Sequence, residues 1–194
     1  MSNYERWKML RLVDLTLAIL GLVVGLPVLL LLLICGFLDT GSPLFFQARI
    51  GRQQKPFVLV KFRTMKPDTV SVATHLADAS AITRFGKFLR KTKLDELPQL
   101  WNVFKGEMSL VGPRPCLLTQ IELIEEREKR KVFDARPGIT GLAQINAIDM
   151  STPNLLAETD ELMLKELSFS SYLKYILLTL FGKGAGDRIK ETAE

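Results

Sequence analysis

The feature that most constrains this chain is a run of 24 residues without a charged side chain, at positions 15–38. As a single α-helix the run would be about 36 Å long, whereas the hydrocarbon core of a bilayer is about 30 Å thick. It is too long for a cleaved signal peptide, and no cleavage site of small residues follows it. The sequence therefore predicts a membrane-associated segment at residues 1–40 and a separate domain at residues 41–194.

The flanks and the middle of this run argue against a simple span. Basic residues lie on both sides, and they are Arg6, Lys8 and Arg11 ahead of it and Arg49, Arg52, Lys55, Lys61, Arg63 and Lys66 behind it. Basic flanks favour the cytoplasmic side, so both ends favour the same side. Pro27 has no N–H and its ring crowds the carbonyl of Val23, which predicts a kink. Two alternatives stay open: a kinked spanning helix, and a re-entrant helix whose freed carbonyl finds a polar partner.

Composition restricts the class of protein for the remaining chain. The 194 residues are 47% hydrophobic and 24% charged, which excludes a disordered, a collagen-like and a multi-span membrane protein. A net charge of +5 suits nucleic acid, phosphorylated substrates or an anionic membrane surface without choosing among them. Cys35 and Cys116 have neither metal-site spacing nor a disulfide framework, and a single histidine, His75, excludes a zinc site of several histidines.

Patterning after residue 40 predicts an α+β fold, a small and mostly helical domain with short strands. The apolar, partly β-branched stretch 57–62 predicts a strand, and residues 67–82, which include His75, read as a loop. Asp95 is placed to cap a short helix that ends at Gly106. Further helices are predicted at 85–91, 117–132, 154–167 and 169–181. The basic helix at 85–91 is expected at the membrane interface, and the apolar helix at 169–181 belongs either to the core or to that interface.

Several polar residues in turns and at helix ends are candidates for chemistry, and they are Lys61, Arg63, Arg90, Asp95, Glu96, Arg114 and Arg136. Arginine forks match phosphate oxygens, and adjacent carboxylates fit a phosphate site with a metal ion. Neighbouring helical residues point about 100° apart, so Asp95 and Glu96 are expected to do different work. One would attack phosphorus or bind Mg²⁺, while the other orients it or moves a proton. Helix capping for Asp95 and surface ion pairs for the arginines stay open as alternatives.

Four stretches, in order, resemble motifs of the bacterial sugar transferases, the small monotopic phosphoglycosyl transferases. They are residues 61–65 (KFRTM), 93–103 (KLDELPQLWNV), 105–115 (KGEMSLVGPRP) and 136–144 (RPGITGLAQ). The resemblance covers residues 12–180, nearly the whole chain. It implies an enzyme at the cytoplasmic face of the bacterial inner membrane, anchored by a re-entrant helix that breaks at Pro27.

The resemblance also implies a reaction. Such enzymes move a sugar 1-phosphate from a UDP-sugar to undecaprenyl phosphate and release UMP, which initiates O-antigen, capsule or glycoprotein glycan assembly. By resemblance, Asp95 is the nucleophile of a ping-pong mechanism and a ligand of Mg²⁺, and Glu96 completes the pair. Phosphate contacts are expected from Lys61, Arg63, Arg90, Arg114 and Arg136. Nucleic acid is not an expected partner, and a homodimer stays open.

Two departures from the family pattern affect these expectations. Relatives often place Ser before the proline of the membrane helix, where Leu26 stands here, so another device must accommodate the kink. Relatives often continue Asn-Gly-Arg after the last motif, where this chain has Asn146, Ala147 and Ile148. We expect Asp149 or Asp160 to line that region instead, with an N-acetylated amino sugar as the donor.

Overall fold

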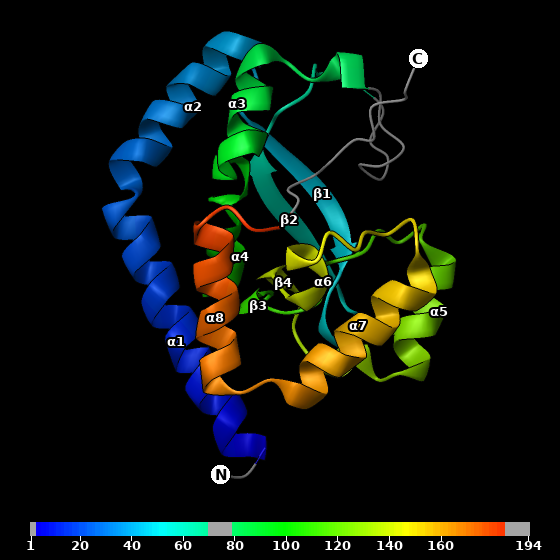
Figure 1. Cartoon of the computed structure of the whole chain (residues 1–194). Coiled ribbons are helices and arrows are strands. Elements are labelled where there is room, and N and C mark those ends of the chain that lie inside the picture. Colours follow the sequence, from blue (N-terminus) through cyan, green and yellow to red (C-terminus); the bar gives the residue numbers. More distant parts are fainter. Residues whose placement is uncertain (1–2, 70–78, 185–194) are drawn as a thin grey trace.

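The computed structural model describes residues 3–69 and 79–184, with helices around two small β-sheets (Figure 1). His75 and most of the predicted loop fall outside the described residues. The helices are α1 (Asn3–Val24), α2 (Leu26–Thr40), α3 (Arg84–Thr92), α4 (Gln99–Lys105), α5 (Ile121–Lys129), α6 (Leu142–Ile145), α7 (Pro153–Glu166) and α8 (Phe169–Leu180). The strands are β1 (Leu44–Ile50), β2 (Pro56–Phe62), β3 (Ser109–Val111) and β4 (Gly138–Thr140). The predicted mixture of helices and short strands is confirmed.

The apolar run folds as two helices that meet at a sharp bend, as predicted from Pro27. Within the described chain no single helix is both long and apolar enough to cross a bilayer, whereas α1 and α2 together are, with a bend of 62° between them. Gly25 lies at the bend, and a Cβ there would come within 2.4 Å of the Gly21 carbonyl oxygen. The lack of a side chain at Gly25 therefore permits the close backbone approach at the bend.

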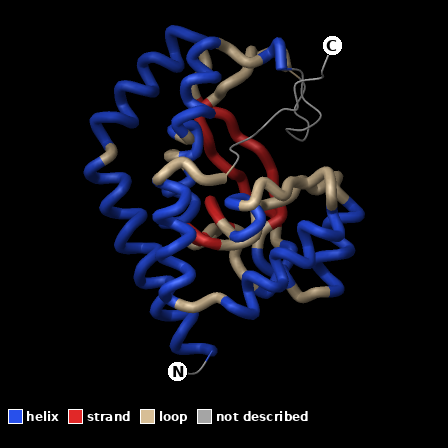
Figure 2. The backbone as a smooth tube through the Cα atoms, in the orientation of Figure 1, coloured by secondary structure: helices blue, strands red, loops and turns tan. Residues whose placement is uncertain are grey.

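Helix α1 has two environments along its length. Leu10 and Ala18 are buried in the core, where α1 packs against α4. Beyond Ala18 and along α2 many apolar side chains are exposed, including Val24, Ile34 and Leu38, although Leu32 of α2 is buried with Phe62 and Leu89. Figure 2 shows the two helices running along one side of the molecule, with the sheets on their inner side. The apolar helix pair is therefore joined to the rest of the chain through both α1 and α2.

The two sheets position the loops that carry the sequence motifs. Strands β1 and β2 form an antiparallel hairpin, in which Leu44 pairs with Phe62, and this confirms the strand predicted at 57–62. Strands β3 and β4 pair in parallel, with Ser109 opposite Gly138. A Cβ on Gly138 would lie 2.0 Å from the backbone nitrogen of Gly112, so the third and fourth motifs are in close backbone contact.

One of the four helices predicted at 85–91, 117–132, 154–167 and 169–181 differs from the helix observed. The helix expected at 117–132 is shorter, because α5 ends at Lys129 and Lys131 then adopts a left-handed conformation with φ of 55°. The helix is also less exposed than its charged sequence indicates, since Leu123 and Arg127 are buried. The helices predicted at 85–91, 154–167 and 169–181 are confirmed as α3, α7 and α8.

Candidate active site

The adjacent carboxylates lie on a 3-10 turn, Leu94–Glu96, between α3 and α4. The prediction that Asp95 caps the following helix was wrong, because α4 begins at Gln99 after Pro98. Pro98 has no N–H to donate to the Leu94 carbonyl, so a continuous α-helix cannot form there, and Leu97 N–H bonds to Leu94 instead. Asp95 is 3% exposed, and Glu96 beside it is partly buried.

Glu96 and Arg114 are brought together across two motifs. The Arg114 Nη2 lies 3.2 Å from the Glu96 Oε1, and both side chains are partly buried. The backbone of Arg114 is itself fixed, because its carbonyl accepts a hydrogen bond of 2.8 Å from the buried Arg127 guanidinium. Flanking Pro113 and Pro115 restrict the same backbone further. This arrangement holds the Arg114 guanidinium against Glu96, the residue that follows Asp95.

Lys93 is a site residue that sequence reasoning missed. It lies in a left-handed turn with φ of 59°, between α3 and the carboxylates. Its Nζ donates to the carbonyl of Lys183 at 2.5 Å and approaches that of Thr179 at 3.5 Å. Burial lowers the pKa of Lys93 below its usual value, opposed by Glu96, and Arg114 lowers it further. The sequence feature that could have identified Lys93 is its position two residues before Asp95.

An apolar groove of about 570 Å³ extends from the charged side chains of Lys93 and Glu96. Its walls come mainly from α1, α8 and the segment between α3 and α4, and apolar wall residues include Leu17, Leu20, Val24, Leu97, Leu100, Ile176 and Leu180. Its polar lining includes Lys93, Glu96, Thr140 and Thr179. The Thr140 and Thr179 hydroxyls lie 2.5 Å apart and join β4 to α8 there. An amphipathic ligand with an anionic head and a hydrocarbon tail fits this chemistry.

Three other predicted phosphate ligands lie on or beside β2. The Arg90 Nε donates to the Thr64 hydroxyl at 2.9 Å, which ties α3 to the KFRTM motif. Arg63 donates to the Ser42 carbonyl at 2.9 Å, and its guanidinium stacks 5.5 Å from the Phe45 ring. The Lys61 Nζ lies 5.7 Å from the same ring. Arg63 therefore stabilises the start of β1 through these two contacts, in addition to any role with substrate.

Arg136 and Asp160 are not brought to the carboxylates. Arg136 lines a different pocket, with its Nε donating to the Gly106 carbonyl at 2.9 Å. Asp160 is fully buried and forms an ion pair of 2.6 Å with Arg127, so its side chain is not accessible to a substrate. Burial raises the pKa of Asp160, and Arg127 opposes that shift. Asp149 accepts a hydrogen bond from the Ser151 N–H at 2.8 Å in a local turn.

Asp95 and Glu96 fit one mode of magnesium binding, in which the substrate supplies some of the ligands. The described residues contain no group of three or more histidine, cysteine, aspartate or glutamate side chains placed to hold a metal ion. Mg²⁺ is commonly held by one or two carboxylates together with substrate phosphates. Asp95 and Glu96 suit that mode, in which the metal arrives with a diphosphate, rather than a cage made by protein alone.

Comparison with known proteins identifies the family. The family model described as bacterial sugar transferase matches residues 5–183. The chain belongs to the bacterial sugar transferase family. This confirms the resemblance inferred from the four motifs, and with it the assignment as a transferase enzyme.

Three relatives illustrate the range of this sugar transferase family. The uncharacterized sugar transferase EpsL of Bacillus subtilis (strain 168) is 40% identical over 183 residues, covering 94% of this chain and 90% of its own. A UDP-glucose:undecaprenyl-phosphate glucose-1-phosphate transferase of Caulobacter vibrioides is 39% identical over 163 residues, covering 81% and 59%. A putative undecaprenyl-phosphate N-acetylgalactosaminyl 1-phosphate transferase of Bacillus subtilis (strain 168) is 43% identical over 108 residues, covering 54% and 60%. The chain thus spans less than two thirds of the last two.

Proposed function

We propose that this sugar transferase moves a sugar 1-phosphate from a UDP-sugar to undecaprenyl phosphate, giving a polyprenyl diphosphate sugar and UMP. The observation that carries the proposal is the placement of Glu96, which lines the apolar groove and pairs with Arg114. A lipid phosphate has the same two-part character as this site, because its tail is apolar and its head is anionic. Undecaprenyl phosphate is in the names of the Caulobacter relative and of the putative N-acetylgalactosaminyl 1-phosphate transferase, which supports the same acceptor.

The proposed chemistry has two displacement steps. The Asp95 carboxylate attacks the sugar-bearing phosphorus of the donor, the bond to the bridging oxygen breaks, and UMP leaves. An oxygen of undecaprenyl phosphate then attacks the same phosphorus, the bond to Asp95 breaks, and the free carboxylate is restored. Lys93, Arg90 and Arg114 hold phosphate oxygens, and Lys61 supplies a further cation on β2. When bound, Mg²⁺ would neutralise the diphosphate charge, with Asp95 among its ligands.

Glu96 has a separate part in this proposal. Its ion pair with Arg114 holds the guanidinium beside Asp95, so that the cation is in position before substrate binds. A carboxylate approaching a diphosphate meets strong repulsion, and preorganised cations reduce it. The burial of Asp95 is consistent with this role, since a low-dielectric site strengthens each of these interactions.

The proposed placement is monotopic, at the cytoplasmic face of the bacterial inner membrane. The bend of 62° lets α1 and α2 enter and leave by one leaflet, which satisfies the basic residues on both flanks. Exposed Leu177, Leu180 and Phe181 at the end of α8 would rest at the interface beside the groove. The acceptor then reaches Asp95 without leaving the bilayer surface.

The test is UMP release by the full chain in detergent, with undecaprenyl phosphate, Mg²⁺ and a panel of UDP-sugars. The panel is needed because the relatives carry glucose, galactose and N-acetylgalactosamine in their names, and we place an N-acetylated amino sugar first. Release from one donor that is lost in Asp95→Asn and retained in the exposed control Glu122→Gln supports the reaction. A folded protein that releases no UMP from any donor contradicts it.

The covalent step has its own readout. Incubation with the donor and no acceptor should release one UMP per enzyme and add the mass of a sugar phosphate to the peptide that contains Asp95. UMP release that strictly requires undecaprenyl phosphate, without an adduct, would overturn the ping-pong order. It would leave the overall reaction standing.

A further inference from the structure

A second pocket, which we call the basic pocket, lies on the opposite face of β3 from the apolar groove. Ser109 and Val111 line the basic pocket, whereas Leu110 between them lines the groove, as expected from the alternation of side chains along a strand. The basic pocket has a volume of about 310 Å³. The two sets of lining residues have no member in common, so the proposed transferase chemistry does not account for this pocket.

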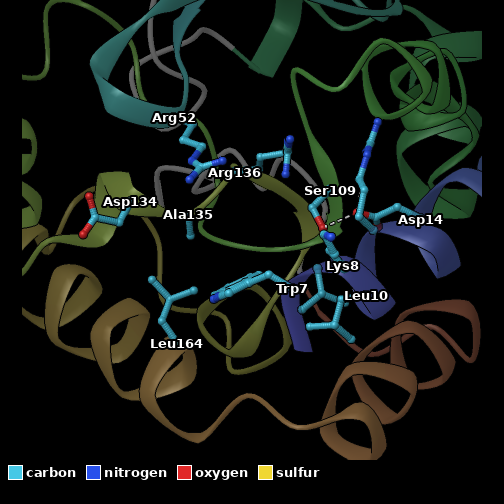
Figure 3. A pocket seen from close by; sticks show the side chains of 12 residues that line it. Trp7, Lys8, Leu10, Asp14, Arg52, Ser109, Asp134, Ala135, Arg136 and Leu164 are labelled. Carbon is cyan, nitrogen blue, oxygen red and sulfur yellow. Dashed lines mark hydrogen bonds and ion pairs between the residues drawn. The ribbon is translucent and has the colours of Figure 1, made fainter. Parts of the chain in front are cut away.

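Four cationic residues line the basic pocket, and they are Lys8, Arg11, Arg52 and Arg136. They come from α1, from the turn after β1 and from the loop before β4, which are far apart in sequence. Figure 3 shows Arg52 and Arg136 together on one wall, with Trp7 and Leu164 across the cavity. Burial lowers the pKa of Arg136, and the neighbouring charges of Arg11 and Arg52 lower it further. The negative charge of Asp14 offsets only part of this effect, so positive charge is concentrated around Arg136.

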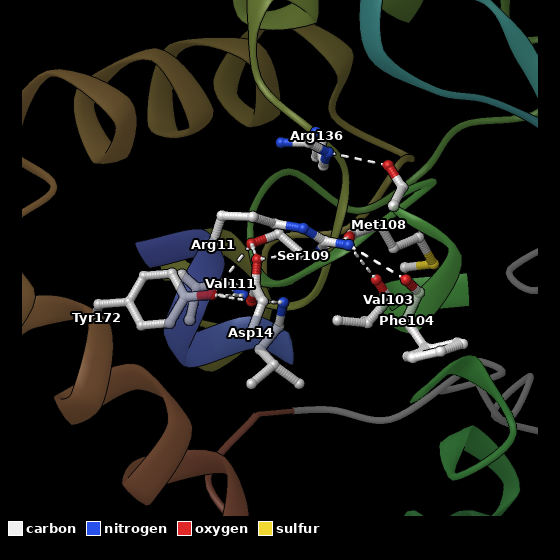
Figure 4. Close-up of polar contacts among 11 residues, drawn as sticks. Arg11, Asp14, Val103, Phe104, Met108, Ser109, Val111, Arg136 and Tyr172 are labelled. Atoms are coloured by element: carbon white, nitrogen blue, oxygen red, sulfur yellow. Dashed lines mark hydrogen bonds and ion pairs between the residues drawn. The ribbon is translucent and has the colours of Figure 1, made fainter. Parts of the chain in front are cut away.

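Two of these cations are held in place by backbone carbonyls, as Figure 4 shows. The Arg11 Nη2 donates to the Val103 carbonyl at 2.8 Å, and the Arg136 Nε donates to the Gly106 carbonyl at 2.9 Å. Both carbonyls are at the end of α4, where orphan carbonyls attract cations. These contacts fix the guanidinium planes before any ligand binds, which reduces the entropy lost on binding.

The acidic residues of the pocket compensate only part of this charge. Asp14 is 2% exposed, and its carboxylate accepts hydrogen bonds of 2.8 Å from the Ser109 hydroxyl and the Leu110 N–H. It also accepts from the Tyr172 hydroxyl, and its ion pair with Arg11 is 3.6 Å long. The other acid, Asp134, is exposed. Two acids against four cations leave a net positive pocket.

We propose that the basic pocket binds a phosphate group, separately from the transferase site. Guanidinium forks match phosphate oxygens, and Arg52 and Arg136 approach from the same wall. An anionic phospholipid headgroup and a free phosphate share this chemistry. Arg11 lies four residues before the charge-free run, or about 6 Å along α1, which places the pocket at headgroup level. The assignment of the pocket to headgroup level rests on the proposed membrane placement. Binding of a free phosphate does not depend on that placement.

The test uses the fluorescence of Trp7, which lines the pocket and is 38% exposed. The chain has two tryptophans, so Trp101→Phe leaves Trp7 as the single reporter in the full chain in nonionic detergent. The probes are inorganic phosphate, dihexanoyl phosphatidylglycerol and dihexanoyl phosphatidylcholine. We expect a saturable signal with the two anionic probes and none with phosphatidylcholine. A tenfold or greater preference for phosphatidylglycerol over phosphate identifies a lipid headgroup as the ligand, and a smaller one identifies free phosphate.

The matched variants are Arg52→Gln and Lys55→Gln, both on the same exposed turn, of which only Arg52 lines the pocket. Losing one charged hydrogen-bond donor should weaken binding about tenfold in Arg52→Gln. Lys55→Gln should stay within about twofold, because it alters only the general surface charge. Equal effects of the two variants, an equal response to phosphatidylcholine, or no saturable signal would overturn the proposal. UMP release is measured separately, so failure here leaves the transferase proposal intact.

Discussion

The hydroxyl of Tyr172 on α8 donates a hydrogen bond to the carboxylate of Asp14 on α1, across 158 residues of sequence. Both side chains are buried, and the same carboxylate accepts from the Ser109 hydroxyl and the Leu110 N–H of β3. Helix α1, the parallel sheet and α8 therefore share one polar junction. This junction also separates the apolar groove from the basic pocket, because β3 lines both.

Removing the Tyr172 hydroxyl should loosen this junction. Tyr172→Phe loses a hydrogen bond to a charged group, which is worth about 1.5–3 kcal/mol of unfolding free energy. Burial raises the pKa of the phenol, and the charge of Asp14 raises it further, so the donor stays protonated across the working range. Thermal unfolding of the detergent-solubilised chain measures the change. Tyr175→Phe on the same helix is the control, and an equal loss in both variants would contradict the role assigned to the junction.

Arg114→Gln should reduce turnover more than it reduces stability. Loss of a preorganised cation at the reacting phosphate lowers kcat by about 10²-fold. Arg130→Gln is a matched control, because Arg130 also pairs with glutamates but lies at the end of α5. UMP release under saturating donor gives kcat for both. A similar kcat in Arg114→Gln and wild type would remove Arg114 from the proposed site.

The lowered pKa of Lys93 predicts an alkaline limit to donor binding. Burial favours the neutral amine in the folded protein, so the cation is lost as pH rises through a value below 10.5. We expect KM for the donor to increase over that range. Lys93→Arg keeps its charge there and should flatten the profile. The neighbouring exposed Lys91→Arg serves as the control. A profile that is unchanged in Lys93→Arg would show that another group sets the limit.

Pro27→Ala should straighten the bend between α1 and α2. The change restores an N–H and removes the ring that crowds the preceding turn. We expect part of the population to span the bilayer with its N-terminus on the far side. Labelling of a single cysteine placed at residue 2, in a background without Cys35 and Cys116, measures this in sealed vesicles. Labelling that remains restricted to the side of the domain would contradict a role for Pro27 in the bend.

Asp160→Asn should affect stability without affecting donor recognition. Removing one partner of a buried ion pair leaves Arg127 charged and uncompensated, which costs about 3–5 kcal/mol. The KM for the donor should stay within about twofold, because the Asp160 side chain is fully buried. Glu158→Gln, an exposed partner of Arg130 on the same helix, is the control for stability. A raised KM at normal stability would restore Asp160 to the sugar site.

Much of the fold follows from neighbours in sequence. The bend at Gly25 and Pro27 depends on backbone groups within four residues, and strand β2 follows from its own apolar pattern. The adjacent carboxylates are identified by the motif that contains them. The same local reasoning misplaced the start of α4, because a proline suited to the first turn of a helix also prevents an earlier turn from joining it.

The sequence by itself determined the bent apolar helix pair, the motif residues and the presence of carboxylates among cationic residues. Only the tertiary structure decided which cation goes where: Arg114 meets Glu96, whereas Arg136 lines a pocket on the other face of β3. It also decided that Asp160 is buried against Arg127 and that Asp14 meets Tyr172. The physical reason is the distance along the chain over which each kind of interaction acts. Helical periodicity and proline geometry act within a few residues, whereas a long charged side chain takes its partner from whatever packing brings near.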